Sequence, residues 1–213
     1  MSARMPLKNM IIGAVIMGFF VSVGTALVAL TWQLTAERIA ENQRQALLRG
    51  LNQLVAPSTY NNAPEEDLIQ VSDPLLGNGS QAVYRARQDG VPVALALRAT
   101  APDGYAGNIE LLIGIRYDGQ LTGVRVLQHR ETPGLGDAID ERRNDWILGF
   151  AGRSLDNPPE ARWLVKKDGG DFDQFTGATI TPRAVVRAVQ RALHYYHNHR
   201  EALFAPLSPV VEE

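Results

Sequence analysis

The stretch IELLIGIRYDGQLTGVRVLQ, residues 109–128, decides the fold class of this 213-residue chain. Branched and large apolar residues dominate both of its halves, which is typical of β-strands. Between the halves stands Tyr117-Asp-Gly-Gln120, and Asp-Gly is a strong signal for a tight hairpin turn. The sequence therefore predicts two antiparallel strands at residues 109–116 and 121–128.

Two further strand-like segments precede this hairpin. Residues 82–88 and 93–99 are rich in Val, Leu and Tyr, and Gln88-Asp-Gly-Val91 between them carries the same turn signal. We therefore expect a meander of four antiparallel strands. Residues 56–79 are rich in Pro, Asn, Asp and Ser, which predicts a mostly irregular connection with a short apolar patch at residues 67–71.

The helical periodicity is strongest at the C-terminal end. Residues 182–202 predict an amphipathic helix whose apolar face packs on the sheet. Residues 138–150 also have a helical pattern, and residues 163–167 could add one more strand. The predicted fold class is α+β, with helices packed around one antiparallel sheet in a single domain. The face expected to meet the sheet comprises Val185, Val189, Ala192, Leu193 and Tyr196.

Near the N-terminus, Met10 to Leu30 is an uncharged and mostly apolar run. In a helix it would be about 30 Å long, the thickness of the hydrocarbon core of a bilayer. A cleaved signal peptide is the alternative, but its apolar region would be shorter and no clear cleavage site precedes a polar mature start. We therefore predict one transmembrane helix at residues 10–31, after a cytoplasmic N-terminus at residues 1–9.

A helical pattern continues from Thr35 to Leu54 and predicts a stalk at residues 32–56, followed by the folded domain at residues 57–213. Basic residues flank the membrane helix on both sides, so their count does not decide the orientation. Long domains are translocated largely regardless of charge. We therefore place the domain outside the cytoplasm.

Small residues recur every four positions along the predicted membrane helix, at Ala14, Gly18, Ser22 and Ala26. Such spacing lets another transmembrane helix approach closely. Because small residues are common in membrane helices in general, the pattern is also compatible with a helix that has no partner. We expect this side to dock onto other membrane subunits.

Composition excludes several classes of function. A net charge of −2 gives no electrostatic case for nucleic-acid binding. The absence of cysteine excludes Cys-ligated iron–sulfur clusters, disulfides and thiol nucleophiles. No glycine-rich dinucleotide fingerprint, P-loop or nucleophile elbow is present. The cluster His194, His197 and His199 is expected to be a solvated helix end rather than a metal site.

The segment Asp173-Gln-Phe-Thr-Gly-Ala-Thr-Ile-Thr181 leads into the last helix. Thr181 suits the N-cap position and Pro182 the first helical position. Thr179 would then lie beside a helix start whose free N–H groups and positive dipole end favour a phosphate. Gly177 allows unusual backbone conformations and leaves room next to the threonine. The segment therefore predicts an exposed hydroxyl at an anion-binding helix start.

A second segment, Glu131-Thr-Pro-Gly-Leu-Gly136, predicts a tight turn centred on Pro133-Gly134. Its bare backbone could lie against a flat ring. Arg183, in the first turn of the last helix, is the best candidate to neutralise a phosphate there, and Lys166 and Lys167 could contribute or could simply be solvated.

The core Thr176-Gly-Ala-Thr179, preceded by Asp173, resembles the recognition motif of the periplasmic flavin transferase, which uses FAD to place FMN on a threonine hydroxyl as a phosphodiester. The resemblance implies that Thr179 is the acceptor. Around it, the resemblance implies a cofactor environment formed by Thr176, Gly177, Ala178 and Thr181.

The segment at residues 131–136 is similar to an element of the FMN-binding domain found in two related respiratory complexes. That similarity implies that the flavin ring is surrounded by Glu131, Thr132, Pro133, Gly134 and Leu135. The loop Gly104-Tyr105-Ala106-Gly107 is placed like another glycine-bearing loop near the flavin in these relatives.

Nearly the whole chain resembles the G subunits of the Rnf complex, also called Rsx, which moves electrons between ferredoxin and NAD and couples this to ion transport. The resemblance implies a membrane-anchored electron carrier with covalent FMN, which is a redox component of the translocase but not a complete enzyme alone. Its partners would be the other membrane subunits and, for maturation, the flavin transferase. The resemblance also implies a single-pass protein of the cell inner membrane, with the C-terminal domain on the periplasmic side. Two alternatives remain open: the same flavin domain in a sodium-pumping NADH:quinone oxidoreductase, whose corresponding chain is generally longer, and a non-redox membrane assembly module.

Overall fold

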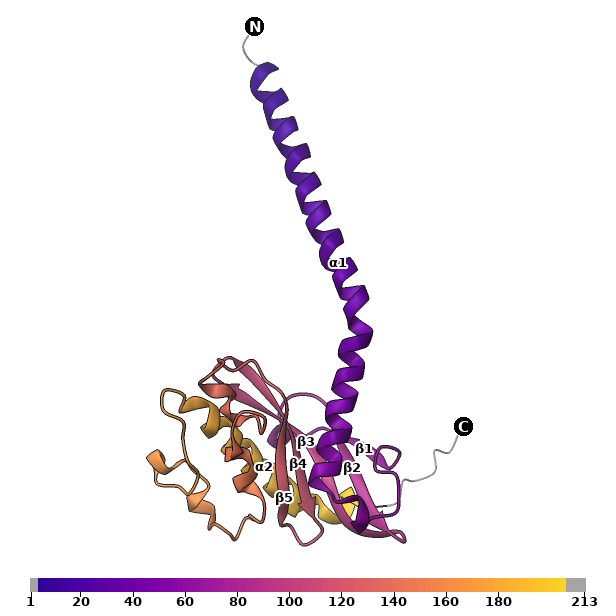
Figure 1. The fold of residues 1–213 in the computed structure, drawn as a ribbon, viewed down its shortest axis with the longest axis vertical. Coiled ribbons are helices and arrows are strands. Elements are labelled where there is room, and N and C mark those ends of the chain that lie inside the picture. The colour runs from indigo at the N-terminus through magenta and orange to yellow at the C-terminus, as the bar shows by residue number, and fades with distance from the viewer. Residues whose placement is uncertain (1–3, 206–213) are drawn as a thin grey trace. The chain divides into compact units, whose positions relative to one another are not determined.

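The computed structural model describes residues 4–205 of the chain (Figure 1). These residues divide into two compact units, the first ending at Gln45 and the second beginning at Ala46. Helix α1, Arg4–Leu54, contributes to both units. It is long and apolar enough to cross a membrane, and its side chains from Met10 to Leu30 are exposed. The helical conformation predicted for these residues and for the following stalk is confirmed.

The second unit is built on a five-stranded sheet in which every strand pairs with its neighbour in sequence, all antiparallel (Figure 1). The α+β fold class is confirmed. The strands are β1 Leu68–Val71, β2 Gln81–Gln88, β3 Val91–Gly104, β4 Gly107–Arg116 and β5 Leu121–Gln128.

The four predicted strands are present, but the sheet has one strand more than expected. The apolar patch at residues 67–71 forms β1, whose Leu68 pairs with Tyr84 of β2. The turn between β2 and β3 has positive φ at both central residues, 51° at Asp89 and 80° at Gly90. This conformation matches the right-handed twist of the flanking strands, which explains why Asp-Gly predicted the hairpin correctly.

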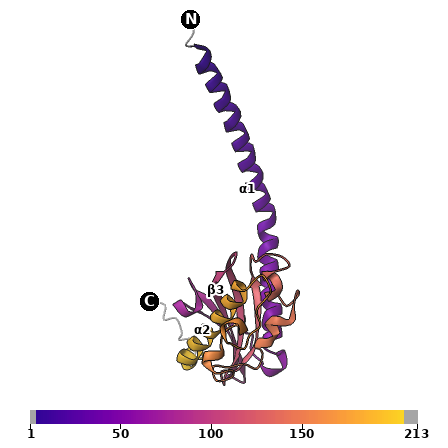
Figure 2. The ribbon, with the colours of Figure 1, turned by 90° about the vertical axis from the view of Figure 1, so that its left-hand side faces the viewer.

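Helix α2, Ile180–Leu203, lies against one face of the sheet (Figures 1 and 2). The five residues predicted to face the sheet are all buried there, together with sheet residues such as Leu97 and Ile113. The opposite face of the sheet is covered by the last turns of α1, through Leu51 and Leu54.

Small residues on that opposite face allow the last turns of α1 to pack closely. Ala94 and Ala96 of β3 are buried in one apolar cluster with Leu51 and Leu54, and Gly114 of β4 lies against Leu54. A Cβ atom at Gly114 would lie 2.9 Å from the Cβ of Leu54, closer than packed carbon atoms approach. Residues 46–54 are therefore part of the folded domain.

The helix predicted at residues 138–150 is wrong. The chain forms two short 3₁₀ turns there, Gly136–Ile139 and Asp145–Phe150. Between them the side chains of Asp140 and Asn144 accept hydrogen bonds from backbone N–H groups two residues ahead, at Arg142 (3.0 Å) and Trp146 (2.8 Å). These local bonds compete with the helical pattern, which the apolar periodicity does not reveal.

The strand considered at residues 163–167 is not formed either. Val165 makes a single bridge to Phe172, and the chain then turns through the 3₁₀ segment Lys166–Asp168. The apolar residues in this stretch serve the core instead: Trp163 is completely buried beside Phe150 and Phe172.

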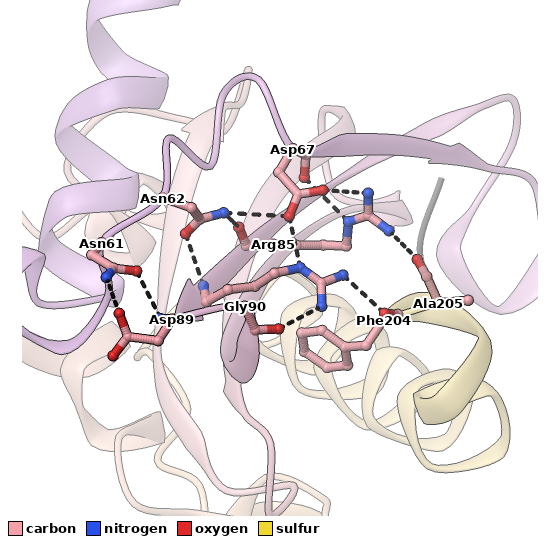
Figure 3. Close-up of polar contacts among 9 residues, drawn as sticks. Asn61, Asn62, Asp67, Arg85, Asp89, Gly90, Phe204 and Ala205 are labelled. Atoms are coloured by element: carbon pink, nitrogen blue, oxygen red, sulfur yellow. Dashed lines mark hydrogen bonds and ion pairs between the residues drawn. The ribbon is translucent and has the colours of Figure 1, made fainter. Parts of the chain in front are cut away.

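The C-terminal end of α2 is fixed to the sheet by two arginines of β2 (Figure 3). Arg85 is 2% exposed and donates to the carbonyl of Ala205 (2.7 Å), while Arg87 donates to the carbonyl of Phe204 (2.8 Å). Both guanidinium groups also pair with Asp67, which precedes β1. Cations at the negative end of a helix dipole are stabilising, so this cluster locks the end of α2 in place.

Candidate functional site

A pocket of about 620 Å³ opens where four segments of the domain meet: the tip of the β3–β4 hairpin, the loop after β5, the 3₁₀ segment Lys166–Asp168, and the start of α2. All three glycine-bearing segments singled out in the sequence contribute to it. The pocket is lined by Tyr105, Glu131, Thr132, Leu135, Gly136, Lys167, Gly177, Ala178, Thr179, Ile180 and Thr181.

The loop after β5 contains the predicted tight turn. The N–H of Leu135 donates to the carbonyl of Thr132 (3.1 Å), and Gly134 between them has φ of 76°, as expected at the third position of a type II turn. The turn brings Leu135 and Gly136 to the pocket. A Cβ at Gly136 would lie 2.8 Å from the Glu131 carboxylate, so this wall of the pocket must be bare.

The threonine segment turns sharply before it reaches the helix. The N–H of Ala178 donates to the carbonyl of Phe175 (3.2 Å), and Gly177 takes a φ of 81°, a conformation that favours glycine. As a consequence, Ala178 and Thr179 follow the turn directly into the pocket wall.

The predicted cap of the last helix is wrong. Helix α2 begins at Ile180, so Thr179 is its N-cap residue and Pro182 is the third helical residue rather than the first. Thr179 has a helical backbone conformation (φ −76°, ψ −26°), and within residues 4–205 its side chain makes no capping hydrogen bond. The first N–H groups of α2 therefore keep their capacity to bind an anion.

Three threonines lie in this segment, and their environments differ. Thr181 is completely buried, and its hydroxyl donates to the carboxylate of Glu131. Thr176 is exposed but does not line the pocket, whereas Thr179 is half-buried and lines it. Thr179 is thus the threonine of the segment that lines the pocket and, within the described residues, is neither fully buried nor engaged in a side-chain cap.

The charges around the pocket are arranged differently from the sequence-based expectation. Lys167 lines the pocket, whereas Arg183 points to Asp168, donating to both carboxylate oxygens at 2.5 and 2.6 Å. The hydrogen bonds from Arg183 hold the pKa of Asp168 below its ordinary value. Arg183 lies in a neighbouring hollow, with Asp168 and Arg187. Among residues 4–205, the cationic residue that lines the pocket is therefore Lys167.

Most of the candidate site residues are brought together by the fold. Thr176, Pro133, Gly134 and Arg183 lie outside the pocket lining, the first three in the turns that shape it. Ile180 lines the pocket but was not singled out, because an apolar residue at a helix start carries no sequence signal. The contribution of each residue to cofactor binding stays a prediction.

The histidines near the end of α2 do not converge. His194 pairs with Glu160 (3.0 Å), and His199 stacks on Tyr195, with its Nδ1 2.9 Å from the Tyr195 carbonyl oxygen. Within the part of the chain that the structure describes, no group of three or more His, Asp or Glu side chains is placed to hold a metal ion.

Comparison with known protein families gives two matches. The FMN-binding domain family matches residues 104–194, which include the β3–β4 hairpin tip, the loop after β5 and the threonine segment. The RnfG N-terminal region matches residues 1–54, a range that includes α1.

Several relatives are similar over almost the full chain. A protein of Pseudomonas aeruginosa, named as the G subunit of an ion-translocating oxidoreductase complex, is 50% identical over 201 residues, covering 93% of this chain and 94% of the relative. Proteins of the same name from Shewanella loihica and Vibrio cholerae are 48% and 47% identical over 198 and 195 residues, covering 92% and 91% of this chain and 93% of each relative.

Proposed function

The chain belongs to the family of G subunits of ion-translocating oxidoreductase complexes, and we propose that it carries FMN covalently on Thr179 and relays electrons within such a complex. The observation that carries the proposal is the position of Thr179. Thr179 lines the pocket and immediately precedes the first helical residue of α2.

The pocket suits a flat, phosphorylated cofactor. Its volume of about 620 Å³ lies in the usual range for small-molecule sites. Tyr105, Leu135 and Ile180 offer apolar surface for a ring, and the bare backbone at Gly136 allows close approach. The open N–H groups of α2 and the ammonium of Lys167 offer what a phosphate requires.

Attachment requires one hydroxyl that a transferase can reach. Thr179 supplies the oxygen: its Oγ–P bond forms to the FMN half of FAD while the P–O bond to the AMP half breaks. AMP departs, and the hydroxyl proton passes to the transferase or to water. Thr181 is excluded as an acceptor by its burial and its hydrogen bond to Glu131. Asp173, the acidic residue of the recognition motif, is exposed and paired with Lys166.

Bound FMN would supply the redox chemistry, and the chain's own residues would hold and orient it. Thr132 and Leu135 would border the ring, while Thr179 and Lys167 hold the phosphate end. Because Arg183 pairs with Asp168, we assign it to the electrostatic surroundings of the phosphate rather than to direct contact.

The membrane helix defines the setting of this carrier. We propose that α1 anchors the chain in the inner membrane, with its small residues facing other subunits and the folded domain on the periplasmic side, where the flavin transferase acts. In the assembled complex, electrons would pass through the flavin between ferredoxin and NAD. The oxidoreductase activity belongs to the assembly and not to this chain alone.

The test is co-expression of the full chain with a flavin transferase, followed by a denaturing gel viewed for flavin fluorescence. We expect a fluorescent band for the unmutated chain and complete loss of fluorescence for Thr179→Val. Thr179→Ser keeps a hydroxyl and should restore fluorescence.

Thr59→Val is the matched control, because Thr59 is exposed and lies outside the pocket. It should leave the band bright. A dark band in the unmutated chain, with an active transferase, would refute the covalent flavin and favour a non-redox assembly role. A bright Thr179→Val band would place the linkage at another residue.

A further inference from the structure

The carboxylate of Glu131 is buried between two segments that are far apart in sequence. Its side chain is 4% exposed. One oxygen, Oε1, accepts a hydrogen bond from the backbone N–H of Ala106 (3.0 Å), and the other, Oε2, accepts from the hydroxyl of Thr181. The carboxylate thus joins the tip of the β3–β4 hairpin to the first turn of α2.

Two glycines make room for this carboxylate. A Cβ at Gly104 would lie 2.9 Å from Oε1, and a Cβ at Gly136 would lie 2.8 Å from Oε2. Neither glycine has a φ in the left-handed region, so backbone conformation does not require glycine there. The space taken by the Glu131 carboxylate explains why Gly136 is bare. At Gly104 the carbonyl oxygen of Gly107 would lie even closer to a Cβ, and the carboxylate adds to that constraint.

Both segments held by Glu131 lie where the regular hydrogen bonding of an element is interrupted or begins. At the end of β3 the strand register is irregular between Ala101 and Gly104, and only Tyr105 and Ala106 separate the last paired residues, Gly104 and Gly107. At the start of α2, Thr179 provides no side-chain cap among the residues that the structure describes. Each segment instead contributes one donor to the same carboxylate.

We propose that Glu131 is a positioning residue that braces the hairpin tip against the start of α2. The brace keeps the wall that carries Tyr105 at a fixed spacing from Thr179, so that the pocket has the same shape before and after the flavin is attached. The effect on flavin attachment rests on the proposed function. The hydrogen bonds of Glu131 to the two segments do not depend on it, because they form in the protein without a cofactor.

Two substitutions of Glu131 should have different effects, because alanine removes both hydrogen bonds of the side chain and glutamine can keep them. Glu131→Ala leaves the Ala106 N–H and the buried Thr181 hydroxyl without the acceptor that they share. Glu131→Gln keeps an oxygen for Ala106, and its NH₂ group can donate to the Thr181 hydroxyl oxygen, which accepts as well as donates. The conservative variant should therefore restore what the alanine variant loses.

The first measurement is hydrogen–deuterium exchange on the full chain in detergent micelles, purified without transferase. In Glu131→Ala we expect exchange to accelerate about tenfold or more in peptides that cover Ala106 and the start of α2, since the Ala106 N–H and the Thr181 hydroxyl lose their acceptor. Glu131→Gln should exchange like the unmutated chain. Thr181→Val removes only the donor to Oε2, so it should accelerate exchange chiefly at the start of α2. This variant replaces Glu131→Ala as the test if Glu131→Ala does not fold.

Asp140→Ala is the matched control. Asp140 is also a buried carboxylate in the region after β5, but it pairs with Arg142 and does not line the pocket. Its loss should accelerate exchange around Arg142 and leave Ala106 unchanged.

The second measurement is the rate at which the transferase makes each variant fluorescent. Glu131→Ala should be slowed about tenfold, while Glu131→Gln stays close to the unmutated chain. Unchanged exchange at both segments in Glu131→Ala would overturn the proposal, as would equal impairment of the Ala and Gln variants. If the unmutated chain stays dark, covalent flavin is refuted, and the exchange experiment still decides whether Glu131 is a brace.

Discussion

At its C-terminal end helix α2 is held by the guanidinium groups of Arg85 and Arg87, whereas at its N-terminal end the Thr179 side chain makes no cap within residues 4–205. Both ends carry backbone groups without helical partners. At one end the protein satisfies these groups itself, which fixes the helix to the sheet. At the other end the Thr179 side chain leaves the first N–H groups uncapped within the described residues, and the buried carboxylate of Glu131, bonded to Thr181 in the first turn, supplies the support instead.

Mutations at the two ends of α2 should therefore differ in what they do. Changes at the C-terminal end should lower stability and leave the pocket intact. Changes at the N-terminal end should disturb the pocket out of proportion to their effect on stability.

The largest expected effect on stability is that of Arg85→Met. The substitution leaves the Ala205 carbonyl without its donor and takes one of two guanidinium partners from Asp67. We expect a loss of about 3 kcal/mol in the free energy of unfolding, measured with urea on the full chain in detergent. The folded fraction should still accept flavin at the normal rate.

Arg98→Met is the control for this change. The pair Arg98–Glu110 is more than a third exposed on both sides, so its loss should cost less than about 1 kcal/mol. If both substitutions lowered the free energy of unfolding equally, the contacts of Arg85 with Asp67 and Ala205 would be no more stabilising than an exposed ion pair.

An intermediate effect is expected for Gly136→Ala at the other end. The new Cβ would lie 2.8 Å from the Glu131 carboxylate and 2.9 Å from the Thr181 hydroxyl, so the loop must shift. We expect a cost of about 1–3 kcal/mol in unfolding free energy and a severalfold slower attachment of flavin. Gly149→Ala, where a Cβ would have no neighbour within 4 Å, should change neither quantity. A stability loss without any change in flavin attachment would contradict the distinction between the two ends.

The smallest effect concerns the exposed pair Asp168–Arg183. Because the folded-state pKa of Asp168 is lowered by hydrogen bonds from Arg183, its contribution to stability is present above the ordinary pKa of 3.8 and is lost as the pH falls through the folded value. The thermal unfolding midpoint of Asp168→Asn should therefore be slightly lower than that of the unmutated chain at pH 7. The two midpoints should converge below about pH 4. A gap that widens as the pH falls would show that the pair has another role.

The parts of the fold that the sequence predicted are those controlled by neighbours in the chain. The Asp-Gly turns impose left-handed conformations locally, so both hairpins could be recognised. The segment around Asp140 and Asn144 was taken for a helix because its apolar spacing is helical, while the polar side chains that break it act on the backbone two residues away. Periodicity alone does not weigh these competing hydrogen bonds.

The sequence identified three of the segments that line the pocket. It did not predict which of their side chains contact one another. Thr181 was assigned as a helix cap from its position, yet its hydroxyl meets Glu131, which is 50 residues earlier in the chain. The sequence predicted that Arg183 would neutralise a phosphate in the pocket, but in the structure its guanidinium group donates to the carboxylate of Asp168. Contacts over such separations depend on how the loops fold back on the sheet, and no local pattern encodes them.

The burial of Leu51 and Leu54 has a practical meaning for anyone who wants the domain free of its membrane segment. A truncated chain starting after these residues would lose the cover of one sheet face and leave Ala94, Ala96 and Leu112 in contact with water. A cut near Ala46 retains the cover. The folded domain thus begins within α1, at Ala46, and not after the end of this helix.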